Sequence, residues 1–304
     1  MPELPEVETV RRGLEPWVVG KKIKEIEVVH RGGNRSTTYV PFSAVEGAKI
    51  VEIARRGKFL WFVLNRDLAM VAHLGMSGQF LIQEKKKEDE KHLRVRVDCG
   101  DRKREIRFVD QRTFGWMAID DLVEQEGNLL PRSFTRIARD VFDPLFDQPK
   151  VISTISKKKS AIKRVLLDQK VMSGVGNIYA DEALWRARIH PEKMANALSV
   201  EEITSLILAV KEVMSAALKQ GGTSFDDLYI NVNGESGYFD VDLEAYGQEE
   251  EPCSRCGTQI RRIVFGNRSS HFCPTCQLNG RSKKSVKKTA LKRGQKPKGR
   301  ELTR

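Results

Sequence analysis

The chain opens with Met1-Pro2-Glu3-Leu4-Pro5-Glu6-Val7-Glu8-Thr9-Val10-Arg11-Arg12-Gly13-Leu14. Acidic residues come early in this stretch and two arginines come late, the order that the helix dipole favours, so residues 5–14 are predicted to form a short helix. If Met1 is removed, Pro2 carries a free secondary amine beside the Glu3 carboxylate. An α-amine has an ordinary pKa of about 7.7–8, so part of it is neutral and nucleophilic near pH 7. Proline also suits a first helical turn, which leaves a purely structural interpretation open at this point.

Eight short segments follow that are rich in Val, Ile and Phe and are separated by turns, which is typical of antiparallel strands. They cover residues 23–29, 49–55, 58–65, 68–74, 78–83, 92–98, 104–109 and 115–119. This number of short strands favours a sandwich or a barrel-like domain. The charged run 84–91 between two of them is expected to be an exposed hairpin loop.

A stretch of 24 residues, 127–150, contains Gly127 and three prolines, and it is predicted to link two domains. Residues 132–139 within it can form a short helix. Further on, Ser199 and Glu202 form a capping box that opens a helix. Apolar residues then recur at helical spacing, which indicates core packing, until Gly221-Gly222 ends the helix.

Four of the five cysteines lie in two pairs with the spacing of four-cysteine zinc sites: Cys253, Cys256, Cys273 and Cys276. Each pair can supply two thiolates from one tight turn, and two turns complete a tetrahedron around one Zn²⁺. With four sulfur ligands the ion has no open position, so it is expected to be structural. Two disulfides are the alternative, but a cytoplasmic protein keeps its thiols reduced. Cys99 stands alone in a predicted strand and is expected to be an inert thiol.

The net charge of +12 is concentrated at the end of the chain. Residues 281–304 hold 11 Lys or Arg and one Glu, a net +10, so the rest of the chain carries only +2. This segment is predicted to be a basic disordered tail that attracts polyanions, although a solubilising extension is the alternative. The sequence has no apolar run of about 20 residues and no secretory signal, which predicts a cytoplasmic protein without membrane contact.

Residues 172–177 read as a tight turn before a helix that runs on to His190-Pro191. Asn177 is expected to cap that helix, and the backbone N–H groups at its start are expected to form an anion site. Gly174 and Gly176 do not follow a predicted strand, so a dinucleotide-binding loop is not indicated.

The opening stretch resembles the start of bacterial formamidopyrimidine-DNA glycosylases of the Fpg/Nei superfamily. The resemblance recurs in order at residues 73–78, 157–159 and 174–180 and at the terminal cysteines, and it spans residues 1 to about 277. It implies an α+β fold in which a short catalytic helix precedes an antiparallel β-sandwich, followed by a helical domain with a helix–two-turn–helix element and a zinc-ribbon β-hairpin. The expected boundaries are 1–130 for the sandwich domain, 131–150 for the linker, 151–250 for the helical domain, 251–280 for the zinc finger and 281–304 for the tail.

The resemblance also implies roles for single residues. Pro2 is the nucleophile, Glu3 the general acid–base and Lys58 a group near the lesion phosphates, with Glu6 in support. The DNA contacts it implies are His92, Arg112, Lys157, Asn177 and Arg268, and the residues that fill the gap left by a flipped nucleotide are Met76, Arg112 and Phe114. Gln111 and Thr113 depart from the family pattern beside the last two. The glycine-rich segment 220–238 is expected to close over the flipped base.

These expectations define a bifunctional enzyme that excises 8-oxoguanine and formamidopyrimidines from duplex DNA and then cleaves the strand by β,δ-elimination. A monomer is expected. Two alternatives are an enzyme like endonuclease VIII, which favours oxidised pyrimidines, and a non-catalytic zinc-ribbon DNA-binding protein. Endonuclease VIII usually has Gly where this chain has Leu4, and a non-catalytic protein has no need of Pro2 and Glu3.

Overall fold

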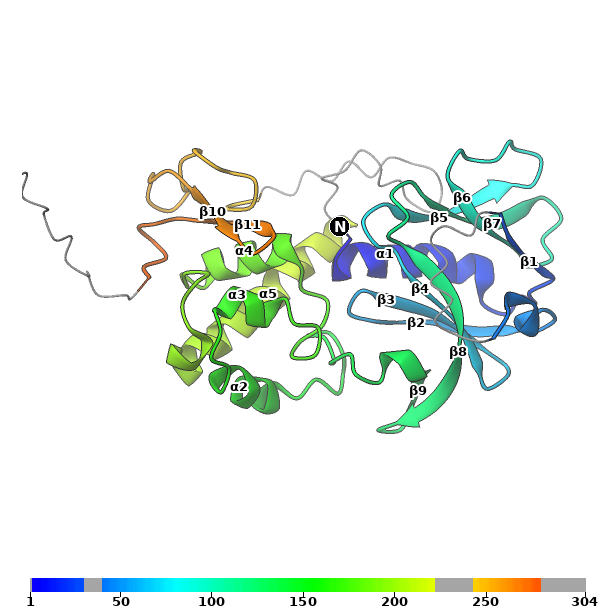
Figure 1. Cartoon of the computed structure of the whole chain (residues 1–304), viewed down its shortest axis with the longest axis horizontal. Coiled ribbons are helices and arrows are strands. Elements are labelled where there is room, and N and C mark those ends of the chain that lie inside the picture. Colours follow the sequence, from blue (N-terminus) through cyan, green and yellow to red (C-terminus); the bar gives the residue numbers. More distant parts are fainter. Residues whose placement is uncertain (1, 30–39, 222–242, 280–304) are drawn as a thin grey trace, which may run out of the picture.

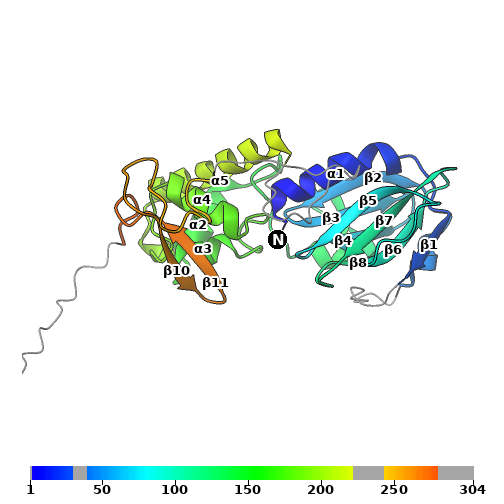
Figure 2. The same cartoon turned by 90° about the horizontal axis from the view of Figure 1, so that it is seen from above.

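A computed structural model describes residues 2–29, 40–221 and 243–279, which form two bodies with the N-terminus at their junction (Figure 1). Among these residues, no helix is long and apolar enough to cross a membrane. The strands β1 to β9 make up one body. The other contains helices α2 to α5 and the hairpin β10–β11, as the view from above also shows (Figure 2).

Two antiparallel sheets face each other in the first body, which confirms the predicted sandwich. One sheet has the order β1-β6-β7-β5, with bounds Glu25–Val28, Leu93–Asp98, Arg104–Asp110 and Gly78–Glu84. The other has the order β2-β3-β4-β8-β9, with bounds Ile50–Arg56, Phe59–Leu64, Leu68–His73, Trp116–Gln125 and Asn128–Pro131. A 3-10 turn, η1, spans Phe42–Val45.

Helix α1 (Leu4–Val18) is longer than the predicted span of 5–14. Its apolar residues continue at helical spacing as far as Val18 and are buried in the core between the two sheets, so packing carries the helix past the predicted end. Pro16 is accommodated in the last turn, and Gly20, with a φ of 83°, follows it.

The five-stranded sheet is covered on both faces. Its outer face carries Trp61 and Val71, and Phe134 from the turn η2 (Arg132–Phe134) packs on them. Strand β9 and η2 lie in the stretch that was predicted to be a linker or a short helix. The first residues of this stretch therefore belong to the sandwich domain, because they bury the apolar outer face of the five-stranded sheet.

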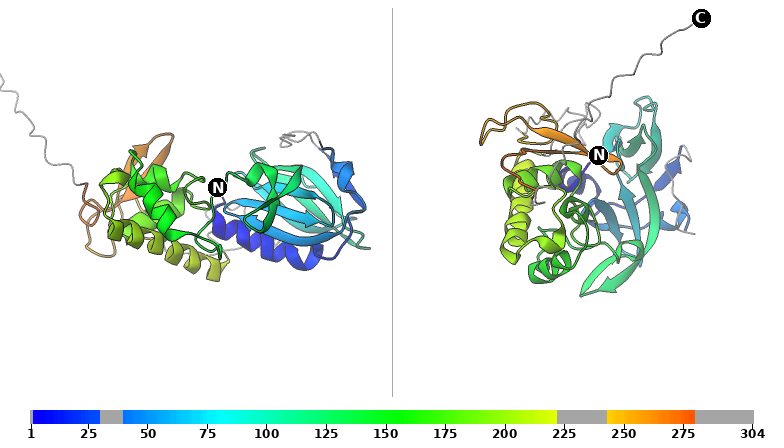
Figure 3. Two further views of the ribbon diagram at one scale, coloured as in Figure 1. Left: turned by 90° about the horizontal axis from the view of Figure 1, so that it is seen from below. Right: turned by 60° about the vertical axis from the view of Figure 1, so that its left-hand side comes forward.

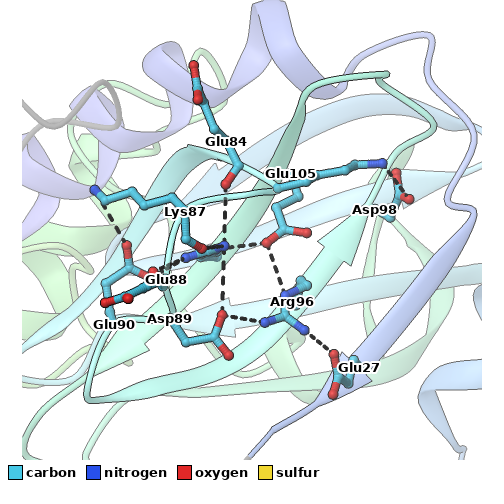
Figure 4. A network of polar contacts seen from close by, with 11 residues as sticks. Glu27, Glu84, Lys87, Glu88, Asp89, Glu90, Arg96, Asp98 and Glu105 are labelled. Atoms are coloured by element: carbon cyan, nitrogen blue, oxygen red, sulfur yellow. Dashed lines mark hydrogen bonds and ion pairs between the residues drawn. The ribbon is translucent and has the colours of Figure 1, made fainter.

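The loop between β5 and β6, with Lys87, Glu88 and Glu90 (Figure 4), wraps around the guanidinium of Arg107, a strand residue that is only 1% exposed. Arg107 donates to the carbonyl oxygens of Lys87 and Glu88, each at 2.9 Å, and forms ion pairs with Glu90 at 3.1 Å and Glu105 at 2.8 Å. The predicted exposed loop is thus held by a buried cation, which sequence reasoning missed.

The second body contains α2 (Gln148–Ser156), α3 (Ile162–Leu166), α4 (Asn177–Arg186) and α5 (Val200–Gln220), with a 3-10 turn η3 at Ala195–Ala197. The predicted capping box at the start of α5 is present, and Gly221 in the left-handed conformation ends the helix. The hairpin of β10 (Arg261–Phe265) and β11 (Arg268–Phe272) lies against α4 (Figure 3).

Contacts of Leu4 and Asp140 are among those that hold the two bodies together. Leu4, the first residue of α1, is buried in the core of the helical body, and its N–H donates to the carbonyl oxygen of Gly174 at 3.1 Å. Asp140 from the connecting segment accepts hydrogen bonds from Arg55 at 2.8 Å and from the Gly57 N–H at 2.9 Å. The N-terminal segment is therefore fixed to both bodies at their junction.

Candidate active site and nucleic-acid interface

The Glu3 carboxylate is bound by the start of helix α4. It accepts hydrogen bonds from the backbone N–H groups of Gly176, Ile178 at 2.9 Å and Tyr179 at 3.4 Å. The anion site predicted at this helix start therefore exists, but a carboxylate of the chain occupies it rather than a DNA phosphate. Asn177 is the first residue of α4 and Gly176 is its N-cap, so the prediction that Asn177 caps the helix was wrong.

Glu6 holds the backbone of Glu3. The Glu3 N–H donates to Glu6 Oε2 at 2.8 Å, and the Tyr179 hydroxyl donates to Glu6 Oε1 at 2.7 Å. Both glutamates are buried, so each charge-assisted bond replaces lost hydration. Pro2 precedes this pair and is half-buried. The segment that carries the candidate nucleophile is therefore rigidly held.

Lys58 reaches the same place from the turn between β2 and β3. Its side chain is buried, and a Cβ atom added to Gly176 would overlap both Lys58 Nζ and the Glu3 carboxyl group. Glycine at position 176 is thus required for the two groups to meet there. Burial lowers the pKa of Lys58, an effect that Glu3 opposes and Arg268 reinforces. Burial raises the pKa of Glu3, opposed by the charge of Lys58 and reinforced by Glu6.

Three polar side chains of the helical body, Lys163, Asp181 and Asn177, bind strand β11. The buried Lys163 pairs with Asp181 at 2.7 Å and donates to the Ser269 carbonyl at 2.9 Å, while Asp181 accepts from Ser270 Oγ at 2.8 Å. Asn177 Nδ2 also donates to the Ser269 carbonyl, at 3.1 Å. The neighbouring Arg268 is exposed and close enough to affect the pKa of Lys58. Lys163 and Asp181 were missed by sequence reasoning, because neither lies in a recognisable spacing.

The four predicted cysteine ligands converge. Their sulfur atoms all lie within 4.8 Å of one another, and Cys256 Sγ is 3.4 Å from Cys273 Sγ. A tetrahedron with Zn–S bonds of about 2.3 Å places its sulfurs about 3.8 Å apart, so the donor set fits one structural Zn²⁺. Ala245 and Trp185 pack around this cluster, which anchors the hairpin to α4. Cys99 lies in the sandwich core, where burial raises the pKa of its thiol to about 12, as expected of an inert residue.

The turn before β5 and the turn before β8 hold the predicted insertion residues side by side. Met76 is 37% exposed and Phe114 59% exposed, so both apolar side chains are accessible at the surface. A Cβ atom on Gly75 would overlap the backbone of Phe114, so the two turns touch through their main chains. Arg112, on the second turn, is also exposed. Met76, Arg112 and Phe114 therefore lie on two touching turns, which form one insertion ridge.

A buried carboxylate, Asp110, locks this ridge together. It accepts from Ser77 Oγ at 2.6 Å and from the Gly115 N–H at 2.7 Å, while Ser77 Oγ accepts from the Arg112 N–H at 2.9 Å. Asp110 is fully buried and was not predicted as a site residue. Thr113, one of the two departures from the family pattern, has a φ of 56°, a strained conformation for a β-branched residue.

Replacing Asp110 with asparagine is expected to leave one buried donor of the two turns unpaired, at a cost of about 1–3 kcal/mol. The insertion ridge then loses its fixed shape, and the variant should flip its target base more slowly. Denaturant unfolding and the fluorescence of 2-aminopurine placed opposite the lesion measure the two effects. Asp101→Asn is the matched control, because the Asp101 carboxylate also accepts two hydrogen bonds, from the backbone N–H groups of Lys103 and Arg104, but is exposed. Equal base-flipping rates in both variants would contradict the role given to Asp110.

Two further DNA contacts were predicted, His92 and Lys157. His92 precedes β6, and its carbonyl oxygen accepts from the Asp110 N–H at 3.0 Å, which places it beside the insertion ridge. Lys157 is exposed at the C-terminal end of α2. The segment expected to close over the base lies almost wholly outside the described residues, as does the basic tail.

Comparisons with known proteins agree with this geometry. Three family models match: the formamidopyrimidine-DNA glycosylase N-terminal domain over residues 1–117, its H2TH domain over 137–228, and a zinc finger found in FPG and IleRS over 250–279. The formamidopyrimidine-DNA glycosylase of Thermobifida fusca is 51% identical over 288 residues, which cover 91% of this chain and 97% of that protein.

Solved structures match as well. The MutM (Fpg) protein of Thermus thermophilus is 36% identical with a TM-score of 0.78, covering 92% of this chain and 100% of that one. Lactococcus lactis Fpg in complex with DNA containing an abasic site is 33% identical with a TM-score of 0.78, covering 91% and 99%.

The fold and the site together define a DNA-repair enzyme of the helix–two-turn–helix class, with glycosylase and abasic-site lyase activities. Within that class, the chain belongs to the formamidopyrimidine-DNA glycosylase family.

Proposed function

We propose that the N-terminal amine of Pro2 is the nucleophile that removes 8-oxoguanine and formamidopyrimidines from damaged duplex DNA. One observation supports this above the others: the adjacent Glu3 is buried, held by three backbone N–H groups of α4 and raised in pKa, so it can carry a proton where the amine reacts. A general acid must combine such placement with a pKa near the working pH.

The reaction follows from these two groups. The Pro2 nitrogen attacks sugar C1′ as the bond to the base breaks, and Glu3 protonates the ring oxygen as the sugar opens. The resulting iminium has no N–H to lose and withdraws electrons from C2′. Loss of a C2′ proton then expels the 3′ phosphate, and a second elimination expels the 5′ phosphate. The Pro2 amine loses its proton as the bond to C1′ forms, the departing base takes up a proton, and the C2′ proton passes to a base at the site or to water. No step changes an oxidation state, so the reaction needs no redox cofactor.

Other side chains bind and deform the DNA. Lys58 and Arg268 supply positive charge beside Glu3, and we assign them to the phosphates next to the lesion. Asn177, His92 and Lys157 are assigned to further phosphates. For Asn177, this requires its second amide hydrogen, because the first is bonded to Ser269. Met76, Arg112 and Phe114 fill the space that the flipped nucleotide leaves.

We propose that the domains divide this work near the boundaries expected from the sequence, with the turn η2 counted with the sandwich. Residues 1–130 supply the nucleophile and the insertion ridge. Residues 151–250 and the zinc finger 251–280 hold the backbone across the junction, and residues 131–150 connect them. We further propose that the protein acts as a monomer in the cytoplasm.

Borohydride trapping on a duplex with one 8-oxoguanine tests the nucleophile, because borohydride reduces an iminium to a stable amine. The expected product is a covalent adduct that mass mapping places on Pro2, with none formed on an undamaged duplex of the same sequence. An adduct on Lys58 would overturn the role of Pro2 but keep the enzyme class. Tight binding of the damaged duplex without any adduct would contradict the lyase mechanism on this lesion.

A further inference from the structure

A cavity of about 640 Å³ lies between the two bodies. Strands β2 and β8, the connecting segment, helix α2 and the turn after α3 all contribute to its wall. Figure 1 places α2 and β9 at the lower edge of the junction, whereas the N-terminus lies at the upper edge. The cavity is therefore distinct from the surface that carries Pro2 and Glu3, neither of which lines it.

The wall of this cavity is strongly cationic. Its five basic residues are Arg56, Arg136, Arg139, Lys150 and Lys170, against two acidic residues, Glu126 and Asp147, which leaves a net +3. Both carboxylates already have partners within the chain. Glu126 pairs with Arg139 at 2.8 Å, and Asp147 accepts from the Lys150 backbone N–H at 2.9 Å. Arg139 also pairs with Asp143 at 2.8 Å, so the positive charge that no ion pair among the described residues compensates lies on Arg56, Arg136, Lys150 and Lys170.

Arg56 is the unusual member of this set. It is only 7% exposed, yet among the described residues its side chain has no hydrogen bond and no ion pair. Burial and the charge of Arg139 lower its pKa. A buried guanidinium is usually paired with carboxylates, as in the preceding residue: Arg55 pairs with Glu8 at 3.1 Å and with Asp140 at 2.8 Å. Asp143, Asp140 and Glu126 lie near enough to oppose the lowering of the Arg56 pKa, but none of them forms an ion pair with it. The Arg56 guanidinium therefore keeps its hydrogen-bond donors for an anion that enters the cavity.

We propose that this cavity binds a phosphate-bearing small molecule, with the Arg56 guanidinium on the phosphate. A guanidinium presents paired N–H donors that match phosphate oxygens, and two lysines at the rim can bind further charge. Gln125, Thr135 and Thr154 line the same space and offer hydrogen bonds to an uncharged part of the ligand. Because the wall comes from both bodies, a bound ligand joins them and stabilises the folded chain.

Pyrophosphate is a suitable probe, measured by calorimetry and by melting temperature at constant ionic strength. The full chain is first saturated with a duplex that holds an uncleavable abasic-site analogue, so that phosphate sites on the DNA-binding surface are occupied. Pyrophosphate is expected to bind this complex and to raise its melting temperature. Displacement of pyrophosphate by excess duplex would show that the sites belong to DNA and would overturn the proposal.

Arg56→Met is expected to weaken pyrophosphate binding about tenfold or more, as loss of charged hydrogen bonds does. Arg132→Met is the matched control, because Arg132 is exposed on the neighbouring turn and does not line the cavity. If Arg56→Met does not fold, Lys150→Met with Lys170→Met removes two exposed cations of the wall and should also weaken binding. Unchanged affinity in these variants, or no binding to the parent complex, would refute the site.

Discussion

Replacing Pro2 with glycine is expected to lower strand cleavage at an abasic site by about 10²-fold or more, a loss typical of a disabled nucleophile. Glycine keeps a terminal amine, but its imine can lose a proton and become neutral, whereas the iminium of proline cannot. Glycine also frees the backbone before Glu3, which is otherwise restrained by proline. Both effects act on the elimination steps that need a cationic nitrogen in a fixed position.

Binding to a duplex with an uncleavable abasic-site analogue should change little, because the phosphate contacts lie on other residues. The measurements are single-turnover cleavage and equilibrium binding. Pro5→Ala serves as a control, since Pro5 lies in the same segment but its nitrogen is part of an amide. A protein whose terminal amine is chemically blocked should lose cleavage entirely. Full cleavage by the blocked protein would refute the mechanism.

Features that depend on nearby residues were predictable from the sequence. The capping box at Ser199, the two cysteine turns and the alternating strands each arise from spacings within a few residues, and the structure contains all of them. Strand ends were accurate to one or two residues for most strands. The end of α1 was missed because Pro16 and Gly13 suggest a stop, whereas burial of Val18 in the sandwich core extends the helix.

Contacts between distant residues could not be predicted in this way. Glu3 and Ile178 are 175 positions apart, and Ser77 and Asp110 are 33 apart, yet each pair is joined by a hydrogen bond inside the protein. No periodicity marks such a pair, because its partners come together only when the chain has folded. The resemblance to the family predicted Pro2 as the nucleophile and Glu3 as the general acid–base. It did not predict that the Glu3 carboxylate occupies the anion site of α4.

Because the Glu3 carboxylate occupies the anion site at the start of α4, Glu3→Gln is the most direct test of Glu3 as the general acid. Glutamine keeps the size of the side chain and one carbonyl acceptor for the N–H groups of α4, but it cannot donate a transferable proton. Base excision should fall by about 10²–10⁴-fold, the usual contribution of a general acid. Excision by the parent protein should decline as pH rises through the raised pKa of Glu3, while the residual rate of the variant should lack that decline.

The free energy of unfolding of Glu3→Gln should rise relative to that of the parent protein although its excision rate falls. This difference separates loss of the general acid from loss of the fold. Burial raises the pKa of Glu3 above the ordinary 4.5, so the stability that Glu3 contributes is complete below that value and is lost as pH rises through its folded pKa. Glutamine does not titrate. The free energy of unfolding of Glu3→Gln should therefore rise relative to that of the parent protein as pH rises through the folded pKa of Glu3.

Glu8→Gln is the matched control on the same helix. Although burial acts to raise it, the pKa of Glu8 is lowered by the hydrogen bond from Arg11 and the charge of Arg55. Glu8 therefore stabilises the fold above pH 4.5, and this contribution is lost as pH falls through its folded pKa. Its glutamine variant should be less stable at neutral pH yet keep its excision chemistry. Equal losses of excision in the two variants would mean that Glu3 acts only through the fold.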